Sequence, residues 1–356
     1  MAHRQYACCP PARKVLITGG AGFIGSHLAD KLLAQNWSVT ALDNFDLFYP
    51  KEIKRQNIRH RIGHPNYRFI GGDIRETALL NALGTERWDA VVHLAARAGV
   101  RPSIADPRGY YDVNVRGTRN VLEMARSAGV KQFVFASSSS VYGVNPNAPW
   151  TEADTGLLPI SPYASTKLAG EFLGHVYSER YGIRFLALRF FTVYGTRQRP
   201  DLAIYKFARA LLAGRPIPLF GGGSTRRDYT HISDIVNGIA AALDYDAGPF
   251  EIFNLGSGRP VELRELIRKL EAITGRQAQI EHLPEQPGDV PQTWADIRKA
   301  ADLLKYAPQI GLNQGLADFV SWVREVPPCA NSFPRETRHL QSHCPPARTL
   351  LRASYI

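Results

Sequence analysis

The sequence predicts a doubly wound α/β fold, in which a parallel sheet is covered by helices on both faces. Short apolar segments alternate with helical patterns through the first half of the chain. A glycine-rich turn follows the first apolar segment, and beyond residue 191 the alternation gives way to shorter elements rich in Pro and Gly. We therefore expect a larger domain at residues 13–191 and a smaller C-terminal α/β lobe at residues 192–326.

The expected strands are short and apolar, as is typical of strands that are buried on both faces. In chain order they are KVLIT (14–18), SVTALD (38–43), YRFIGGD (67–73), DAVVHLAA (89–96), KQFVFASS (131–138) and IRFLALRFF (183–191). Helical spacing of apolar residues predicts helices between them at 23–34, 75–82, 108–128 and 162–181. The smaller lobe is expected to contain FEIFNLGSG (250–258) and helices at 232–245, 261–273, 296–305 and 313–325.

Composition and charge exclude several classes of protein. No apolar run approaches the roughly 18 residues that span a bilayer, and no secretory signal is recognisable, so we expect a cytoplasmic protein without membrane contact. Of the net charge of +11, six units lie in residues 1–14 and 327–356, and the rest of the chain carries no nucleic-acid-binding motif. The moderate basic surplus of the remainder suits an anionic small-molecule substrate.

The two ends of the chain differ from its body. Residues 1–12 and the proline-rich residues 327–356 show little periodicity and are expected to be disordered. These segments hold all four cysteines of the chain, which are Cys8, Cys9, Cys329 and Cys344. We therefore expect no disulfide framework, no metal site and no catalytic thiol.

The turn after the first expected strand, TGGAGFIGSHLAD (18–30), indicates a dinucleotide site. Gly19, Gly22 and Gly25 allow a tight turn and the close approach of a pyrophosphate, and the following helix offers free N–H groups to the phosphates. Asp43 ends the second strand at the distance expected of a ribose-binding carboxylate, which favours NAD over NADP. The remaining cofactor contacts expected here are Phe23, Ile24 and Asn44.

A hydroxyl group and a Tyr–Lys pair form the candidate catalytic group. The strand at 131–138 leads into a run of four serines (137–140), and Tyr163 and Lys167 lie one turn apart on the next predicted helix. An ammonium group beside a phenol favours the phenolate, so we expect Lys167 to lower the pKa of Tyr163. A phenol with a lowered pKa can act as the base in a hydride-transfer reaction near neutral pH.

Four segments together, TGGAGFIG, HLAA, SSSSVYG and YASTK, resemble the extended short-chain dehydrogenase/reductase family in its nucleotide-sugar epimerase/dehydratase branch. The resemblance implies a Rossmann domain that binds NAD, a C-terminal substrate domain, and a homodimer formed through two helices of each subunit. It places the catalytic hydroxyl on Ser138, beside Tyr163 and Lys167. It also implies cofactor contacts at Asp73, Ile74, Leu94, Ala95, Ala96 and Asn114.

The resemblance also narrows the reaction. Dehydratases of the branch carry Asp-Glu directly before VYG, where this chain has Ser139 and Ser140, so dehydration is not expected. The segment RFFTVYGTRQRPD (189–201) most resembles UDP-glucuronate 4-epimerases, although TRQRP replaces their more usual PWGRP. The expected reaction converts UDP-glucuronate to UDP-galacturonate through a 4-keto sugar. The alternatives are a UDP-glucose 4-epimerase, a related decarboxylase or dehydrogenase, and a non-catalytic protein that senses NAD.

The same resemblance implies how a UDP-sugar is held. Ser139, Ser140 and Thr192 are expected to restrain the sugar carboxylate, whose β-keto acid intermediate could otherwise lose CO₂. Arg227, in TRRDYTH, and Arg199 are the expected diphosphate ligands, since guanidinium groups bind phosphate with two hydrogen bonds. Asp289 is the expected contact to the nucleotide ribose.

Overall fold

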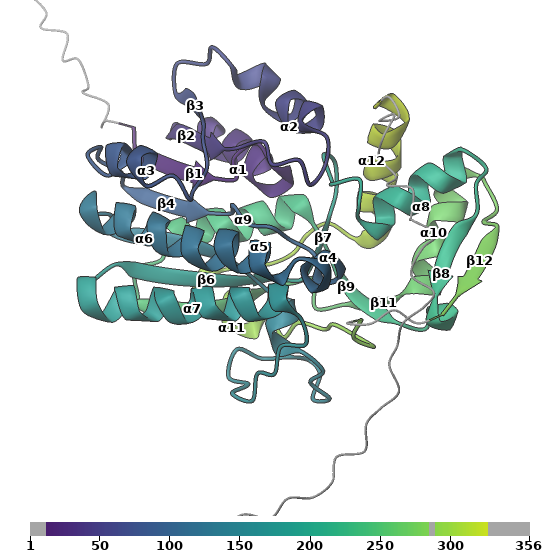
Figure 1. Cartoon of the computed structure of the whole chain (residues 1–356). Coiled ribbons are helices and arrows are strands. Elements are labelled where there is room, and N and C mark those ends of the chain that lie inside the picture. The colour runs from purple at the N-terminus through teal and green to yellow at the C-terminus, as the bar shows by residue number, and fades with distance from the viewer. Residues whose placement is uncertain (1–11, 285–288, 327–356) are drawn as a thin grey trace, which may run out of the picture.

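A seven-stranded parallel sheet forms the centre of the larger domain (Figure 1). The computed structural model describes residues 12–284 and 289–326, so the four cysteines and nearly all of both terminal segments lie outside the described residues. The strand order is β10–β6–β5–β4–β1–β2–β3, and every neighbouring pair is parallel. These strands are β1 (Lys14–Thr18), β2 (Ser38–Asp43), β3 (Tyr67–Gly71), β4 (Ala90–His93), β5 (Gln132–Ser138), β6 (Arg184–Phe190) and β10 (Phe250–Leu255).

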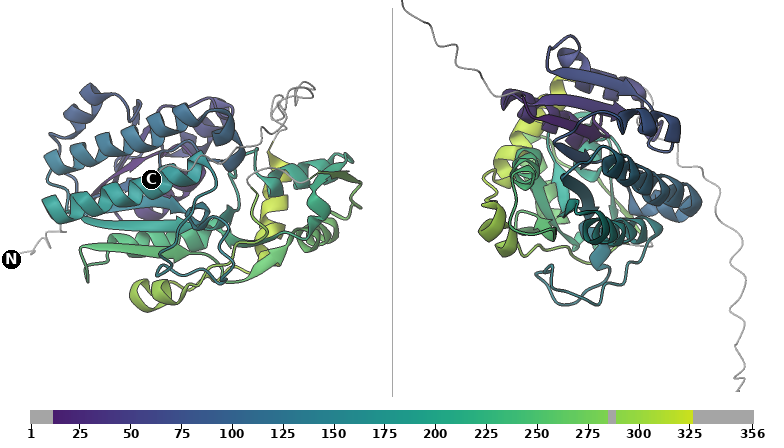
Figure 2. Two further views of the ribbon diagram at one scale, coloured as in Figure 1. Left: turned by 60° about the horizontal axis from the view of Figure 1, so that its bottom comes forward. Right: turned by 90° about the vertical axis from the view of Figure 1, so that its left-hand side faces the viewer.

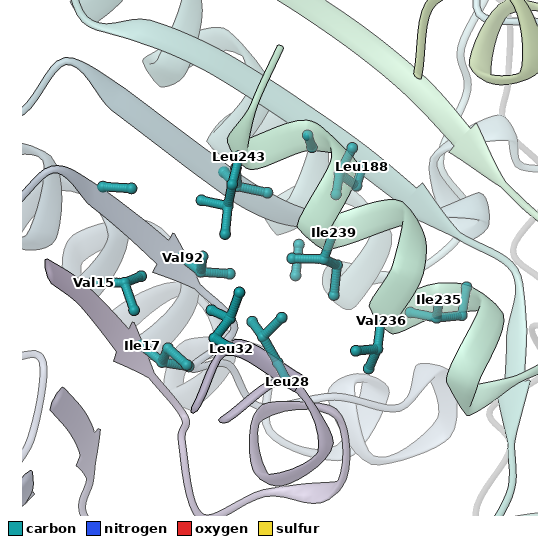
Figure 3. Packing of buried hydrophobic residues seen from close by; sticks show 14 of the residues in the cluster. Val15, Ile17, Leu28, Leu32, Val92, Leu188, Ile235, Val236, Ile239 and Leu243 are labelled. Atoms are coloured by element: carbon teal, nitrogen blue, oxygen red, sulfur yellow. The ribbon is translucent and has the colours of Figure 1, made fainter. Parts of the chain in front are cut away.

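Helices cover both faces of this sheet, which confirms the predicted fold class. One face is covered by α1 (Phe23–Ala34), α9 (Ile232–Leu243) and α11 (Arg298–Leu304), and the other by α3 (Thr77–Leu83), α6 (Gly117–Ser127) and α7 (Pro162–Tyr181). Alternate residues of β1 point to opposite faces: Val15 and Ile17 belong to the core under α1 and α9, and Leu16 to the core under α6. Figure 3 shows Leu28 of α1 and Ile239 of α9 in the first of these cores.

The smaller lobe lies beyond the carboxyl ends of the sheet (Figure 2). It contains a three-stranded sheet of β7 (Thr192–Tyr194), β9 (Arg226–His231) and β11 (Pro260–Glu262), and a pair formed by β8 (Ile217–Phe220) and β12 (Ile280–Leu283). Three helices, α8 (Ala203–Leu212), α10 (Leu263–Thr274) and α12 (Leu312–Glu325), enclose a third apolar core with these strands. Among the described residues, no helix is both long and apolar enough to cross a membrane.

The expected domain boundary at residue 192 differs from the observed path of the chain. After β9 the chain returns to the larger domain, where α9 packs against α1 and β10 pairs with β6 along Phe250–Leu255. The physical reason is burial: Phe253 and Leu255 are fully buried in the core beneath α9. The segments at 232–243, 250–255 and 298–304, assigned to the smaller lobe from the sequence, therefore belong to the larger domain.

Three short helices not separately predicted lie beside the carboxyl ends of the strands. They are α2 (Lys51–Ile58), α4 (Val100–Ala105) and α5 (Pro107–Tyr111). The single helix expected at 108–128 consists of α5, a π-helical turn η2 (Asp112–Arg116) and α6. Such a π-helical turn is frequently found beside functional sites.

Candidate active site

A cavity of about 540 Å³ lies at the carboxyl ends of the parallel strands, between the sheet and the smaller lobe. Twenty of the residues predicted from the sequence as site residues line it. They are Gly19, Gly22, Phe23, Ile24, Gly25, Asp43, Asn44, Asp73, Ile74, Leu94, Ala95, Ala96, Ser138, Ser139, Ser140, Tyr163, Lys167, Thr192, Arg199 and Arg227.

The glycine turn between β1 and α1 has the close packing that a dinucleotide cradle needs. Gly19 has a φ of +72°, which favours glycine, and its N–H donates to the carbonyl of Leu42 at 2.7 Å. A Cβ added to Gly25 would lie 2.3 Å from the carbonyl oxygen of Gly19, so only glycine fits there. Gly22 caps α1 without a side chain, leaving the first N–H groups of the helix facing the cavity for an anionic group. The residues present fit a dinucleotide pyrophosphate.

Asp43 faces the cavity and also accepts hydrogen bonds from the backbone of the glycine turn and of the segment that follows β2. Its carboxylate accepts hydrogen bonds from the N–H groups of Ala21 at 3.1 Å and Phe45 at 2.8 Å. The ammonium group of Lys54, from α2, lies 3.7 Å from the same carboxylate. Each carboxylate oxygen retains acceptor capacity for a ribose hydroxyl. The pairing of Lys54 with Asp43 was not anticipated, because α2 was not predicted.

A second carboxylate and an amide lie at the end of β3. Asn44 donates a hydrogen bond of 2.7 Å to Asp73, which also accepts two hydrogen bonds from the guanidinium group of Arg75. Hydrogen bonding from Arg75 lowers the pKa of Asp73 to about 2, so this carboxylate is ionised at neutral pH. Ile74 follows it and is buried with its side chain against the cavity wall. These residues suit the adenine end of a dinucleotide.

The end of β4 is fixed by a buried histidine. His93 shares a hydrogen bond of 2.6 Å with Thr18 and another of 3.0 Å with Thr118. Burial lowers the pKa of His93 to about 3, so the imidazole is neutral and acts as a structural residue. Thr18 in turn accepts a hydrogen bond from the N–H of Ala95, the middle residue of the predicted nicotinamide-side segment 94–96.

The three candidate catalytic residues converge where β5 meets α7. Ser161 caps α7 by accepting a hydrogen bond from the N–H of Ala164, and Tyr163 and Lys167 follow on the first two turns. Ser138 is the last residue of β5, and its hydroxyl is hydrogen-bonded to Tyr163. The ammonium group of Lys167 donates a hydrogen bond of 2.7 Å to the carbonyl of Ala136 and lies 5.9 Å from the Tyr163 ring centre.

The electrostatics of this group differ from the sequence-based expectation. Burial raises the pKa of Tyr163, and the effects that lower it are the hydrogen bond with Ser138 and the charge of Arg199. Burial also lowers the pKa of Lys167 to about 7, which weakens the charge that Lys167 can present to its neighbours. The pKa of Tyr163 is therefore raised, where the sequence predicted a lowered one, and Arg199 is the charged group that acts in the lowering direction.

The four serines have distinct surroundings. Ser137 points to the buried carboxylate of Glu171, and Ser138 faces Tyr163. Ser140 receives a hydrogen bond of 3.2 Å from the Ser138 hydroxyl, while its own N–H donates to that oxygen. Ser139 begins the short helix η3 (Ser139–Tyr142), and both Ser139 and Ser140 line the cavity. The run therefore spans the end of β5 and the start of η3.

The two candidate arginines lie in different environments. Arg199 forms a two-bond ion pair with Asp201, at 2.9 and 2.6 Å, and its guanidinium carbon lies 5.0 Å from the Phe48 ring centre. Arg199 lines the cavity together with Tyr163, and its charge lowers the pKa of Tyr163. Arg227 donates one hydrogen bond to the carbonyl of Arg226 and forms no ion pair with a described residue.

Two predicted site residues do not line the cavity. Asn114 is buried. Its side-chain oxygen accepts a hydrogen bond from the N–H of Arg97, and its amide nitrogen donates to the carbonyl of Arg97 and to the hydroxyl of Thr166. It fixes the β4–α4 segment against α7, and its contact with the cofactor stays a prediction. Asp289 pairs with Arg101 at 2.6 Å, and its contact with the nucleotide ribose stays a prediction.

Several cavity residues were missed from the sequence. Among them are Tyr49, Lys54, Arg97, Gln198 and Tyr229. Arg97 directly follows the predicted segment 94–96. Its position next to this segment could have identified it as a cavity residue. Lys54 is one of several basic residues on α2 and has no distinguishing pattern, because only the fold brings its side chain to Asp43.

Comparisons with known proteins agree with this geometry. The family model described as the NAD dependent epimerase/dehydratase family matches residues 15–256. A UDP-glucuronate 4-epimerase from Thermodesulfobacterium geofontis is 40% identical over 313 residues, which cover 87% of this chain and 96% of that protein.

Solved structures are similar over most of the chain. The crystal structure of a UDP-glucuronic acid 4-epimerase from Bacillus cereus, in complex with UDP-glucuronic acid and NAD, is 38% identical with a TM-score of 0.83. It covers 88% of this chain and 99% of that one. A UDP-glucose 4-epimerase from Thermotoga maritima with UDP-glucose is 31% identical with a TM-score of 0.81, covering 88% of this chain and 99% of that one.

Proposed function

Because the chain belongs to the NAD dependent epimerase/dehydratase family, we propose that it is an NAD-dependent 4-epimerase that interconverts UDP-glucuronate and UDP-galacturonate. One observation carries the reaction type: Ser138, Tyr163 and Lys167 meet in the same cavity as the dinucleotide turn. NAD, when bound, supplies a reversible hydride acceptor at C4 of the sugar. The glycine turn, Asp43, Asn44 and Asp73 are the residues that would hold it.

Tyr163 transfers the proton of the sugar O4, and Ser138 assists by hydrogen bonding. In the ionised form Tyr163 accepts this proton as C4 becomes a ketone, and it returns the proton when the alcohol is restored. Ser138 hydrogen-bonds the same oxygen and keeps the pKa of Tyr163 lower than burial alone would make it. Lys167, anchored to the carbonyl of Ala136, orients this end of α7 beside the sugar.

The residues after Ser138 support epimerisation over dehydration. Ser139 and Ser140 line the cavity where an acid pair would be needed to remove water from the sugar. Serine hydroxyls cannot supply a proton at neutral pH, but they can hold a carboxylate by hydrogen bonds. With Thr192 they are the groups we assign to the uronate carboxylate, whose restraint limits loss of CO₂ from the 4-keto intermediate.

Two arginines are the groups that we assign to the remaining parts of the substrate. The sequence predicted Arg199 as a second diphosphate ligand. Because Arg199 lines the same cavity as Tyr163 and its charge lowers the pKa of Tyr163, we assign it to the sugar end of the UDP-sugar instead. Arg227 has no ion-pair partner among the described residues and suits the diphosphate. The ribose contact predicted at Asp289 is supported less well, because this carboxylate is paired with Arg101 and does not line the cavity.

A homodimer through α7 is the assembly that we propose. The outer face of α7 exposes Phe172 (64%) and Val176 (51%), which lie one turn apart. Ile104 and Tyr111 on the neighbouring helices α4 and α5 are exposed as well. Since α4 and α5 pack against α7, these side chains are suited to a self-complementary interface in a symmetric dimer. A cytoplasmic location stays a prediction from the sequence.

The experiment that tests the function is product analysis by NMR after incubation with UDP-glucuronate or UDP-glucose, without added NAD. We expect UDP-galacturonate from the first substrate and a much lower kcat/KM for the second. Preference for UDP-glucose would identify the alternative 4-epimerase. Release of CO₂ or accumulation of NADH would indicate a decarboxylase or dehydrogenase instead, and binding of NAD without turnover would indicate a sensing protein.

A further inference from the structure

The loop that carries Arg199 is tied to the helix that begins at the dinucleotide turn. This loop, residues 195–202, joins β7 to α8. The carbonyl oxygen of Thr196 bonds the imidazole of His27 on α1 at 2.9 Å. The guanidinium group of Arg197 donates a hydrogen bond of 2.7 Å to the carboxylate of Asp30 and one of 3.4 Å to the hydroxyl of Ser26. Asp30 and Ser26 also lie on α1. Side chains one turn apart on α1 therefore hold two successive residues of the loop.

The carboxylate of Asp30 is a shared acceptor for three basic groups. Arg61 and His60 donate to one of its oxygens, at 2.5 and 2.9 Å, and Arg197 donates to the other. Burial raises the pKa of Asp30, but the hydrogen bonds from these three groups outweigh it and hold the pKa far below the ordinary value. Asp30 is therefore an anion throughout the neutral range, and Arg61, which is itself buried, fixes its position.

The backbone of Arg197 shows that its position is imposed by these contacts. Its φ is +60°, a left-handed conformation that glycine and asparagine adopt more readily than arginine. A residue with a long side chain persists in this conformation only where its surroundings hold it there. Of the two polar contacts of its side chain described above, the ion pair with Asp30, at 2.7 Å, is the shorter.

The next two residues of the loop face the cavity. Gln198 and Arg199 both line it, and the amide of Gln198 donates a hydrogen bond of 3.2 Å to the carbonyl of Val193. The Arg199 guanidinium lies over Phe48, which belongs to the β2–α2 connection beside Asp43. The loop therefore contacts α1 through residues 196 and 197, and the cavity through residues 198 and 199.

We propose that Arg197 is a positioning residue that pins the loop 195–202 to α1 through Asp30 and thereby sets where Arg199 meets the sugar of the substrate. This inference rests on the proposed function for the identity of the substrate, but the pinning of the loop does not depend on it. The arrangement links the helix that begins at the cofactor turn to an arginine that lines the same cavity as Tyr163.

The test compares Arg197→Asn with Arg197→Lys in the full-length protein loaded with NAD. Asparagine retains the preference for the left-handed backbone and removes the charge, whereas lysine retains the charge. Arg276→Asn is the matched control, because Arg276 is exposed and lies outside the cavity. Three quantities are measured: hydrogen–deuterium exchange of residues 195–202, and the kcat and KM for UDP-glucuronate.

We expect faster exchange in residues 195–202 of Arg197→Asn and a KM about tenfold higher, with kcat changed much less. Arg197→Lys should recover most of both effects, and Arg276→Asn should match the wild type. Unchanged exchange in this loop would overturn the inference, as would faster exchange spread over the whole chain. Exchange reports on the loop without turnover, so a wild-type protein inactive on UDP-glucuronate would refute the proposed function alone.

Discussion

The carboxylate of Glu171 accepts a hydrogen bond from the hydroxyl of Ser137, the residue that precedes the candidate catalytic Ser138. The same carboxylate forms a two-bond ion pair with Arg189 of β6, at 2.9 and 2.8 Å, and both side chains are only 2% exposed. Glu171 lies one turn after Lys167 on α7. A buried ion pair therefore joins α7, β5 and β6 directly behind the reacting groups.

Glu171→Gln is expected to destabilise the protein, because it leaves the buried charge of Arg189 without a counter-charge. The free energy of unfolding should fall by about 3–5 kcal/mol, measured by urea denaturation. Glu86→Gln breaks an exposed pair with Arg68 and should cost less than about 1 kcal/mol. The double variant Glu171→Met with Arg189→Met removes both charges and should recover stability. A Glu171→Gln protein as stable as Glu86→Gln would contradict this account.

Ser138→Ala is expected to shift the pH dependence of epimerisation. The hydrogen bond with Ser138 lowers the pKa of Tyr163, so its removal raises that pKa further above the ordinary value. Because Tyr163 must be ionised to accept a proton, the limb on which kcat rises with pH should move to higher pH. At neutral pH we expect a loss on the order of 10²-fold. Ser127→Ala, an exposed control, should leave the profile unchanged, and an unshifted limb in Ser138→Ala would exclude this role.

Arg227→Met tests the diphosphate contact. Burial lowers the pKa of Arg227, and this cation forms no ion pair with a described residue, so its removal should not lower the melting temperature. The KM for UDP-glucuronate should rise at least about tenfold, because the diphosphate loses a charged hydrogen-bond donor. The KM of Arg227→Lys should lie between those of the wild type and Arg227→Met. A KM equal to that of the wild type would remove Arg227 from the substrate site.

Phe172→Glu tests the proposed homodimer. A carboxylate in the centre of the exposed apolar face of α7 would be buried against its symmetry mate, which is strongly unfavourable. Light scattering after size-exclusion chromatography should show a dimer for the wild type and a monomer for the variant. Leu303→Glu places the same change on α11, on the opposite face of the sheet, and should remain dimeric. A monomeric wild-type protein would refute the proposed assembly.

Much of the fold follows from local patterns. The strand at 38–43 and the helix at 23–34 have the predicted boundaries, because a buried apolar run and the glycine turn before α1 fix them. The place of β10 could not be predicted in this way. Its residues read as one more short apolar strand, and only the packing of Phe253 and Leu255 under α9 assigns it to the large sheet.

The candidate site was likewise predictable where it depends on local motifs, and not where it depends on contacts between distant segments. Motif residues such as Ser138 and Tyr163 meet because the carboxyl ends of parallel strands share one edge, which the sequence pattern predicts. The pKa of Tyr163 was misjudged because it depends on burial and on Arg199, which is 36 residues away in the sequence. The ion pair between Arg197 and Asp30 also joins distant segments, and no local pattern indicates it.

The most direct test of the central claim uses UDP-glucuronate that carries deuterium at C4. The account holds that the hydrogen removed from C4 returns to the same carbon, while the proton of O4 is handled by Tyr163. After incubation with the wild-type protein in ordinary water, NMR should show UDP-galacturonate that retains deuterium at C4, and Tyr163→Phe should form no product. Loss of the deuterium to solvent, or full activity in Tyr163→Phe, would contradict the account.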